Sequence, residues 1–368
     1  MPTPTLEKKG RVTRHAHVGI PEGTFEEEHA RRGFFGRTSQ LYHLRPPTAW
    51  VRVEGPLRPR LLAGRDASPA DRSDGRGGML TLLENEDCVV SLSRRSQAME
   101  FFVRNADGDE IHFVHQGSGT FETDYGRLAY EPGDYLWIPK GTTYRVVPAG
   151  ADNFFLVTEA HEFSLPERGL MGHYAFLDPS LLESPEPDPH DEQGREFEVR
   201  IKRDRQWSSL FYRHHPLDVV GWRGDLMPLR LNVRDLRPVV SDRYHMPPTV
   251  HATFISDPVA ICTFAPRPME SDPECIKVPY YHRNMDYDEV LFYHSGEFFS
   301  RHGIGPAAMT IHPQGLHHGP AAKAFEAARQ KKATHEVAVL IETKRSLRLT
   351  EEALKLEDPA YHTNWSQE

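Results

Sequence analysis

The stretch His282–Glu289 reads HRNMDYDE, and an earlier stretch, Val103–Glu110, reads VRNADGDE. Five of the eight positions are identical at an offset of 179 residues. The same offset pairs Gly117 with Gly296, each of which follows the matching glutamate by seven residues. A repeat whose pieces keep their order indicates two copies of one structural unit.

A second pair of matching segments follows the first at an offset of 174 residues: PKGTTY (Pro139–Tyr144) and PQGLHH (Pro313–His318). Short β-branched and aromatic runs bounded by turn residues recur between them, such as Glu110–Val114 and Val290–Tyr293. This pattern predicts a mainly β chain, built as two small antiparallel jelly-roll barrels in tandem. A short helix is predicted over Pro320–Lys331, where a proline precedes good helix formers.

The acidic, proline-rich segment Asp178–Gly194 divides the chain near its middle and is predicted to be a linker. We therefore expect five segments. They are an N-terminal arm that packs on the barrels (1–60), a first barrel (61–178), a linker (179–200), a second barrel (201–345) and a C-terminal tail (346–368).

Composition excludes several classes of protein. The chain has 44 Lys and Arg against 53 Asp and Glu, a net charge of −9, and no long basic block, so nucleic acid is not an expected partner. No apolar run approaches the roughly 18 residues that span a bilayer, and Met1–Arg14 lacks the apolar core of a signal peptide. A cytoplasmic protein without a membrane partner is expected. The three scattered cysteines suit neither a disulfide framework nor a thiolate zinc site, so any metal must bind imidazole and carboxylate.

The second copy of the repeat carries a set of metal-ligand types. His282 lies seven residues before Glu289, and His318 ends the second matching segment. Two imidazoles and one carboxylate that leave other positions open are typical of Fe(II) oxygenases, whose metal binds substrate and O2. Iron is therefore the preferred metal, although zinc or manganese would show a similar pattern.

The first copy serves as an internal control for this interpretation. Val103 and Tyr144 stand where the second copy has its two histidines, and only Glu110 remains. One carboxylate cannot hold Fe(II) against water. The first barrel is therefore predicted to be degenerate and to bind no metal.

Several longer motifs resemble one known family. They are YYHRN (Tyr280–Asn284), HHGP (His317–Pro320), HPLDVVGWRGDLMPLRLN (His215–Asn232), FAPR (Phe264–Arg267) and LYHLRPPTAW (Leu41–Trp50). They resemble homogentisate 1,2-dioxygenase, a family of the cupin superfamily, most clearly from about Leu210 to Leu349. The resemblance implies a tandem cupin (bicupin) fold and an Fe(II) enzyme that uses O2 to open homogentisate to maleylacetoacetate in tyrosine and phenylalanine breakdown. It also implies a homo-oligomer, either a trimer or a dimer of trimers.

Carried over by position, the resemblance assigns the iron ligands to His282, Glu289 and His318. This chain has one extra residue between the first histidine and the glutamate, so Asp288 occupies the ungapped position. The spacing to Gly296 favours Glu289 as the ligand. The chain is also shorter than typical members of the family.

A base that takes the phenolic proton of the substrate is needed beside the metal, and a histidine suits this task. The resemblance selects His245, at the head of HMPPT, and His251 is the alternative six residues on. The resemblance also places a second active-site histidine at His312. This histidine would hold oxygen or support a ligand.

An acidic substrate needs a cation, and arginine can bind a carboxylate through two hydrogen bonds. Arg283 and Arg267 are the nearest arginines in the sequence, although a structural salt bridge is the alternative for both. The family has a substrate-contacting tyrosine where this chain has Phe298, which removes a hydroxyl.

Two other functions compete with ring opening of homogentisate. One is a related dioxygenase acting on gentisate or another hydroquinone acid, whose relatives use three histidines, so that Glu289 argues against it. The other is a non-enzymatic cupin that binds a small acid, which needs no open metal site.

Overall fold

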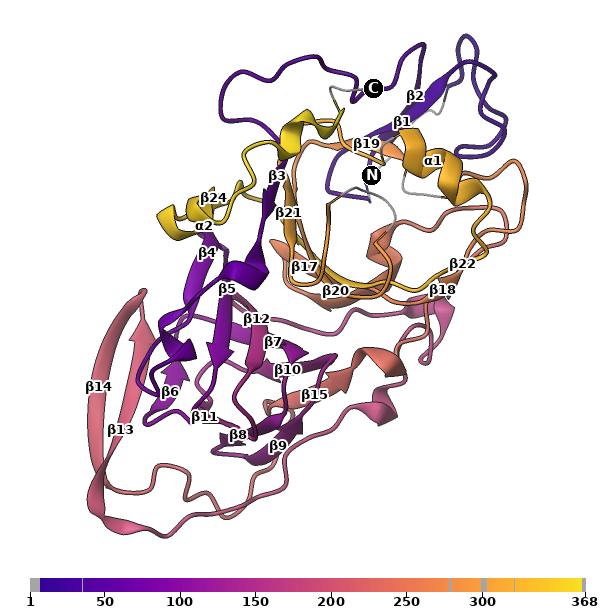
Figure 1. The fold of residues 1–368 in the computed structure, drawn as a ribbon. Helices are drawn as coiled ribbons and strands as arrows, with labels where there is room; N and C mark the ends of the chain where they lie inside the picture. Colours follow the sequence, from indigo (N-terminus) through magenta and orange to yellow (C-terminus); the bar gives the residue numbers. More distant parts are fainter. Residues whose placement is uncertain (1–6, 35, 278–279, 299–302, 321, 366–368) are drawn as a thin grey trace.

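The computed structural model describes residues 7–34, 36–277, 280–298, 303–320 and 322–365. Strands dominate, and the two α-helices are short: α1 (Ala322–Arg329) and α2 (Glu351–Lys355) (Figure 1). Short 3-10 turns lie at Gly64–Asp66, Ala70–Arg72, Gly169–Met171, Pro179–Leu181, Val233–Asp235, Pro248–His251 and Tyr361–Trp365. The predicted mainly β fold with short helices is confirmed, and α1 lies within the stretch predicted as helix.

The first unit, here called the N-terminal barrel, consists of two facing sheets. In spatial order, the seven-stranded sheet contains β15 (Leu229–Asn232), β10 (Asp134–Ile138), β7 (Asp109–Gln116), β12 (Asn153–Ala160), β5 (Cys88–Arg95), β4 (Leu80–Glu84) and β24 (Arg348–Leu349). The six-stranded sheet contains β14 (Gln206–His214), β13 (Gln193–Arg203), β6 (Phe102–Asn105), β11 (Thr143–Pro148), β8 (Gly119–Thr123) and β9 (Gly126–Tyr130). Buried side chains from both sheets, including Val114, Phe121 and Phe155, fill the space between them.

The second unit, here called the C-terminal barrel, has one large and one small sheet. The large sheet contains β16 (Ala252–Ile255), β17 (Val259–Phe264), β23 (Val337–Thr343), β20 (Asp288–Ser295), β21 (Met309–His312) and β3 (Arg60–Leu62). The small sheet contains β19 (Tyr281–Asn284), β1 (Phe25–Ala30) and β2 (Thr38–His43). A two-stranded ribbon, β18 (Arg267–Pro268) and β22 (Ala333–Thr334), lies beside them.

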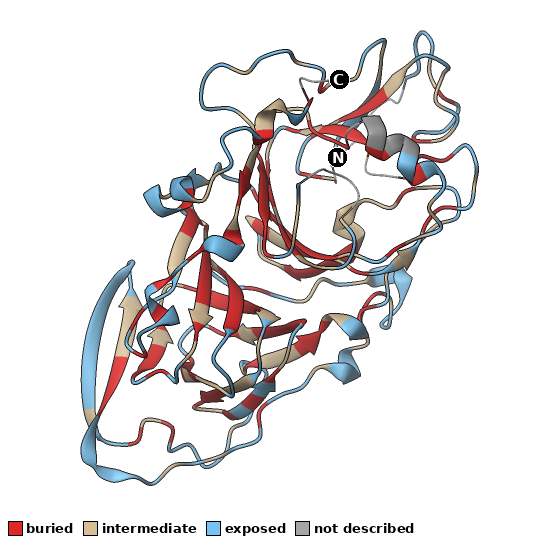
Figure 2. Ribbon diagram, viewed as in Figure 1, coloured by how far each residue is buried: buried red, intermediate tan, exposed pale blue. Residues whose placement is uncertain are grey.

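The two barrels pack back to back through their large sheets, and the main hydrophobic core lies between them. Alternate residues of β7 and β20 face this core, and the rings of Phe113 and Phe292 meet at 6.3 Å. The intervening residues point into the two barrels, because successive side chains of a strand face opposite ways. The strands between the barrels are buried, whereas the outer strand β14 is exposed (Figure 2).

Strands near each end of the chain pair with the barrel formed mainly by the other half of the chain. β1, from the expected N-terminal arm, pairs with β19 of the C-terminal barrel, and β3, which spans the expected boundary between the arm and the first barrel, pairs with β21 of the C-terminal barrel. β24, from the C-terminal tail, pairs with β4 of the N-terminal barrel. β13, β14 and β15 also belong to the N-terminal barrel. The expected boundary between linker and second barrel at residue 201 therefore falls inside β13 and must move beyond Asn232, the end of β15. No helix in the described ranges is long and apolar enough to cross a membrane.

His115 and His294, two repeat-related residues 179 positions apart, meet at the interface between the barrels. Their Nδ1 atoms lie 3.0 Å apart, so one ring must donate and the other accept. Burial lowers the pKa of His294 to about 4, and burial together with the neighbouring His294 lowers the pKa of His115 to about 4. The neutral pair therefore stabilises the fold above the ordinary histidine pKa near 6.5, and this contribution is lost as the pH falls through 4.

We predict that the wild-type protein loses thermal stability between pH 6.5 and pH 4, and that the double variant His115→Phe/His294→Phe loses less, because phenylalanine cannot take up a proton. Thermal unfolding followed by circular dichroism across this pH range measures the difference. His161→Gln, at an exposed histidine, is the control. An unchanged pH dependence in the double variant would contradict the assignment.

Candidate metal centre

Three predicted ligands converge inside the C-terminal barrel. Glu289 lies on β20, His282 lies on β19, and His318 is held opposite His282 by reciprocal backbone hydrogen bonds of 2.9 and 3.0 Å. The His282 Nε2 lies 3.3 Å from one Glu289 carboxylate oxygen, and the His318 Nε2 lies 2.9 Å from the other. All three are buried, and their candidate ligand atoms lie within 4.8 Å of one another.

Both imidazole rings are oriented by the backbone. The Nδ1 of His282 donates to the Tyr280 carbonyl at 2.9 Å, and the Nδ1 of His318 donates to the Leu316 carbonyl at 3.2 Å. A proton held on Nδ1 leaves Nε2 as the ligating atom, which is the usual arrangement of metal-bound histidine. The donor set and its orientation therefore fit a divalent transition metal.

Glu289 is a buried carboxylate whose charge needs compensation. Burial alone would raise the pKa of Glu289, but the charges and hydrogen bonds of His318 and His282 lower it well below the ordinary value. The amide of Asn284 also donates to one carboxylate oxygen. The side chain is thus held ionised, as a metal ligand must be.

The neighbouring Asp288 faces away from the two histidines. Its carboxylate accepts the backbone N–H groups of Gln314 at 2.8 Å and Leu347 at 2.7 Å. The extra residue before Glu289 therefore places the aspartate on the face of β20 that points away from the site. The carboxylate that meets the imidazoles is that of Glu289.

Two further side chains surround the glutamate on neighbouring strands. His312 pairs with Glu289 across β20 and β21, and its ring stacks on that of His318 at 4.6 Å. Glu342 pairs with Glu289 on β23. Burial and the Glu289 charge raise the pKa of Glu342 well above the ordinary value, so it is an un-ionised acid. Glu342 was not predicted from the sequence, because only the pairing of β23 with β20 places it beside Glu289.

Gly33 brings the N-terminal arm against this acid. Its φ is +63°, and an added Cβ atom would lie 2.6 Å from a Glu342 carboxylate oxygen. Only glycine satisfies both the left-handed backbone and the close approach. The ring of Phe34 then lies 4.8 Å from that of His282.

A series of contacts between rings leads from the predicted ligand His282 to Tyr244, the residue before His245. His282 is 6.1 Å from the ring of Tyr280, which stacks on His17 at 3.9 Å, and His17 is 5.4 Å from Tyr244. These contacts connect the ligands to the segment that carries His245.

A carboxylate and a guanidinium hold the His245 ring between them. The Nδ1 of His245 is 2.8 Å from Glu270, and the Arg267 Nη2 is 3.5 Å from its Nε2. Burial lowers the pKa of His245, while Glu270 opposes that shift. The ring is thus a neutral, oriented base, and Glu270 is a partner that the sequence analysis did not identify.

His251 has a different environment. Its Nε2 donates to the Val239 carbonyl at 3.0 Å, and its ring packs against Phe176. Burial lowers the pKa of His251 to about 4. This histidine supports its own turn, so the geometry favours His245 over His251 as the base.

The two arginines predicted to bind the substrate, Arg283 and Arg267, also lie in different environments. Arg283 follows His282 on β19 and therefore faces outward, where it contacts Glu27 at 3.3 Å and His29 at 2.8 Å. It does not join the three predicted metal ligands. The Arg267 side chain is 9% exposed beside His245, and its Nη1 lies 3.6 Å from the Glu270 carboxylate without a hydrogen-bond partner among the described residues.

Phe298, the position where the family has tyrosine, packs its ring edge-on against Tyr293 at 5.0 Å. Both rings belong to a small hydrophobic cluster at one end of the C-terminal barrel.

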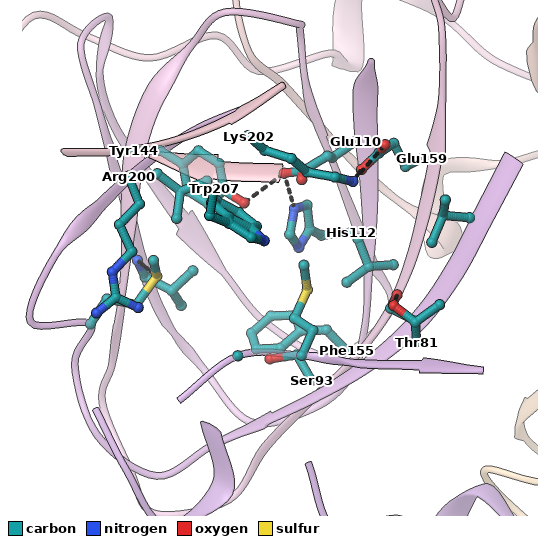
Figure 3. A pocket seen from close by; sticks show the side chains of 18 of the residues that line it. Thr81, Ser93, Glu110, His112, Tyr144, Phe155, Glu159, Arg200, Lys202 and Trp207 are labelled. Carbon is teal, nitrogen blue, oxygen red and sulfur yellow. Dashed lines mark hydrogen bonds and ion pairs between the residues drawn. The ribbon is translucent and has the colours of Figure 1, made fainter. Parts of the chain in front are cut away.

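The N-terminal barrel shows what the equivalent positions do without the histidines. Glu110 accepts hydrogen bonds from Tyr144 at 2.5 Å and His112 at 3.1 Å (Figure 3). It also accepts one from Asn105 at 3.0 Å. Despite its burial, these partners lower the pKa of Glu110 to about 2. Tyr144 takes the place of His318, and the glutamate charge is satisfied within the protein.

Another group of potential ligands, His190, Glu192 and His215, lies on the N-terminal barrel. The two imidazole rings stack at 4.1 Å with an interplanar angle of 21°, and the His215 Nδ1 accepts the Leu217 N–H. Ligand lone pairs lie in the ring planes, so two nearly parallel rings at this separation do not converge on one ion. This geometry is poorer than that of the candidate metal centre.

Two facing-sheet barrels in tandem, of which one carries two imidazoles and a carboxylate, define a bicupin with one candidate metal centre. Family models for the N-terminal and C-terminal parts of homogentisate 1,2-dioxygenase match residues 85–233 and 245–367. The chain belongs to the homogentisate 1,2-dioxygenase family.

Individual relatives agree with this membership. A Saccharolobus solfataricus protein named as a candidate dioxygenase is 34% identical over 97% of this chain and 98% of its own length. Homogentisate 1,2-dioxygenase of Rhizobium etli is 26% identical over 78% of this chain and 69% of its own length. Among solved structures, protein Ylba from E. coli is similar with a TM-score of 0.39, at 9% identity over 80% of this chain and 95% of its own.

We predict that Glu289→Ala abolishes retention of Fe(II), because two imidazoles alone hold the ion weakly, and that His282→Ala and His318→Ala do the same. Iron content after gel filtration of the reconstituted protein measures the loss. Asp288→Ala is the matched control. It should keep iron while losing about 1–3 kcal/mol of stability, since two backbone N–H groups lose their acceptor. Loss of iron in Asp288→Ala with retention in Glu289→Ala would reverse the assignment.

Proposed function

We propose that the protein is an Fe(II)-dependent dioxygenase that opens the aromatic ring of homogentisate. The observation that carries the proposal is the convergence of His282, Glu289 and His318 in one barrel of a homogentisate 1,2-dioxygenase family member. Bound at these three residues, iron would provide open positions for the phenol and O2 and would lower the pKa of the phenol.

His245 is proposed as the base that takes the phenolic proton. Its Nδ1 proton is directed to Glu270, so its Nε2 is the atom able to accept a proton. As Nε2 becomes protonated, the Glu270 carboxylate compensates the new charge. Burial, together with the like charge of the nearby Arg267 guanidinium, lowers the pKa of the histidine and favours its neutral form in the resting protein.

Arg267 is also proposed to bind the substrate carboxylate. Its side chain is 9% exposed and lies beside the proposed base, and its Nη1 is 3.6 Å from the Glu270 carboxylate without a hydrogen-bond partner within the described ranges. A carboxylate on Nη1 would place the aromatic ring of the acid near His245. Arg283, on the outer face of β19, has no such role in the proposal.

The rival functions differ from this proposal in substrate and in turnover. A gentisate-type enzyme of the kind with three histidine ligands does not match the carboxylate of Glu289, and a non-enzymatic acid-binding cupin consumes no O2. Oxygen uptake by the iron-loaded protein, measured separately with homogentisate and with gentisate, distinguishes the three. We expect uptake of one O2 per homogentisate with loss of the aromatic absorbance; uptake with gentisate alone, or no uptake, would contradict the proposal.

Oligomerisation remains a prediction from the resemblance. β14 supports it, because this edge strand exposes Trp207 and Phe211 to the extent of 52% and 61%. Light scattering during gel filtration measures the assembly.

We predict that His245→Gln retains iron and lowers kcat by about 10²- to 10⁴-fold, the usual contribution of a positioned base. His251→Gln is the matched control and should mainly lower the thermal stability, because it loses the hydrogen bond to Val239. Measurement of kcat per bound iron, together with the Tm of each variant, separates the two roles. A full rate in His245→Gln with the loss in His251→Gln would transfer the base to His251.

A further inference from the structure

The interior of the N-terminal barrel holds a cavity of about 720 Å³, although the barrel lacks metal ligands (Figure 3). Small-molecule sites commonly have volumes of 300–1,000 Å³. The cavity lies between β5, β7 and β12 of the seven-stranded sheet on one side and β11, β13 and β14 of the six-stranded sheet on the other, and Trp207 of β14 is among its lining residues. The size is that of a ligand site, and the proposed dioxygenase reaction does not use it.

One wall of the cavity is apolar. Its side chains come from strands of both sheets and from the segment that precedes β6, and are Met99, Phe101, Val103, Val146, Phe155 and Val157. Such a wall suits the hydrocarbon or aromatic body of a ligand.

Most charged groups around the cavity are already paired. Glu110 accepts three hydrogen bonds from the side chains around it. Lys202 pairs with Glu159 at 2.5 Å, and Arg200 pairs with Glu198 at 2.9 Å. The Arg200 guanidinium also lies 3.6 Å over the Phe101 ring. These pairs balance one another and leave no strong net charge for a polyanion.

Arg95, at the end of β5, is the exception. It is only 4% exposed, yet it lines the cavity along with Ser91 and Ser93 of the same strand face. Its Nη2 donates to the Gly77 carbonyl at 3.0 Å, and its Nε lies 3.8 Å from the Asp71 carboxylate. Its Nη1 has no hydrogen-bond partner within the part of the chain that the structure describes. A buried guanidinium N–H without an acceptor is costly, so Nη1 calls for an oxygen acceptor.

We propose that the N-terminal barrel is a second binding site, for a small monocarboxylic acid with an apolar or aromatic body. The carboxylate accepts a hydrogen bond from the Arg95 Nη1, and the body packs on the wall that includes Phe101 and Val146. The site binds without a metal, since Val103 and Tyr144 occupy the ligand positions. The proposal is independent of the proposed dioxygenase function, because none of its residues belongs to the C-terminal barrel.

Phenylacetate is a suitable probe, and 2-phenylethanol is its uncharged counterpart. Isothermal titration of the iron-loaded protein without O2 measures the number of phenylacetate sites and their affinity. Arg95→Met should weaken one site by about 10- to 100-fold, the value of a charged hydrogen bond. Val146→Phe, which fills the cavity and leaves the Arg95 contacts in place, should remove the same site. Wild-type protein should bind 2-phenylethanol at this site no more tightly than Arg95→Met binds phenylacetate.

Arg94→Met is the matched control, because Arg94 faces the opposite side of β5, over the ring of Phe154. It should bind phenylacetate as the wild type does, and circular dichroism confirms that each variant is folded. Isotherms of Arg95→Met and Val146→Phe that superimpose on the wild type, or a wild-type protein that does not bind phenylacetate, would overturn the proposal. Because the assay reads binding rather than turnover, its outcome does not depend on whether the protein opens homogentisate.

Discussion

The buried charge of Glu289 is the constraint on which the rest of the site depends. A carboxylate removed from water must be matched by nearby cations or donors, and this one is met by two imidazoles and an amide. Those partners come from β19 and from the segment at His318, so both must be held against β20. The same arrangement that satisfies a carboxylate in the metal-free protein presents three ligand atoms to a metal.

The alternation of strand residues lets the sheet that carries this site also join the two barrels. On β20, Glu289 faces the site while Val290 and Phe292 face the core between the barrels. The repeat-related β7 does the same, with Glu110 inside its barrel and Phe113 in the shared core. A one-residue shift of either strand would turn the apolar set into the barrel interior and remove the glutamate from its partners, so packing specifies the register.

Much of the site was predictable because the repeat compares one barrel with the other. The matching glutamates and the paired replacement of histidine by Val103 and Tyr144 identified the barrel that carries ligands. The downstream spacing to Gly296 favoured Glu289 over Asp288. The structure shows why, because the Asp288 carboxylate accepts backbone N–H groups on the face of β20 opposite Glu289.

Other features depend on contacts between distant segments and have no local signal. β1 pairs with β19 across about 250 residues of chain, and this parallel pairing holds Arg283 on the outer face with Glu27. The participation of β13 in the N-terminal barrel moved the domain boundary for the same reason. Glu270 and Glu342 became visible only when the fold placed one beside His245 and the other beside Glu289.

The central claim is that one barrel of the pair holds the metal and the other is closed to it by Tyr144 and Val103. Anomalous diffraction at the iron absorption edge, from crystals of the iron-loaded protein, tests this claim most directly. The account predicts one anomalous peak per chain, bounded by the Nε2 atoms of His282 and His318 and the carboxylate of Glu289. A peak beside Glu110, or one at His190, Glu192 and His215 with none at Glu289, would contradict it.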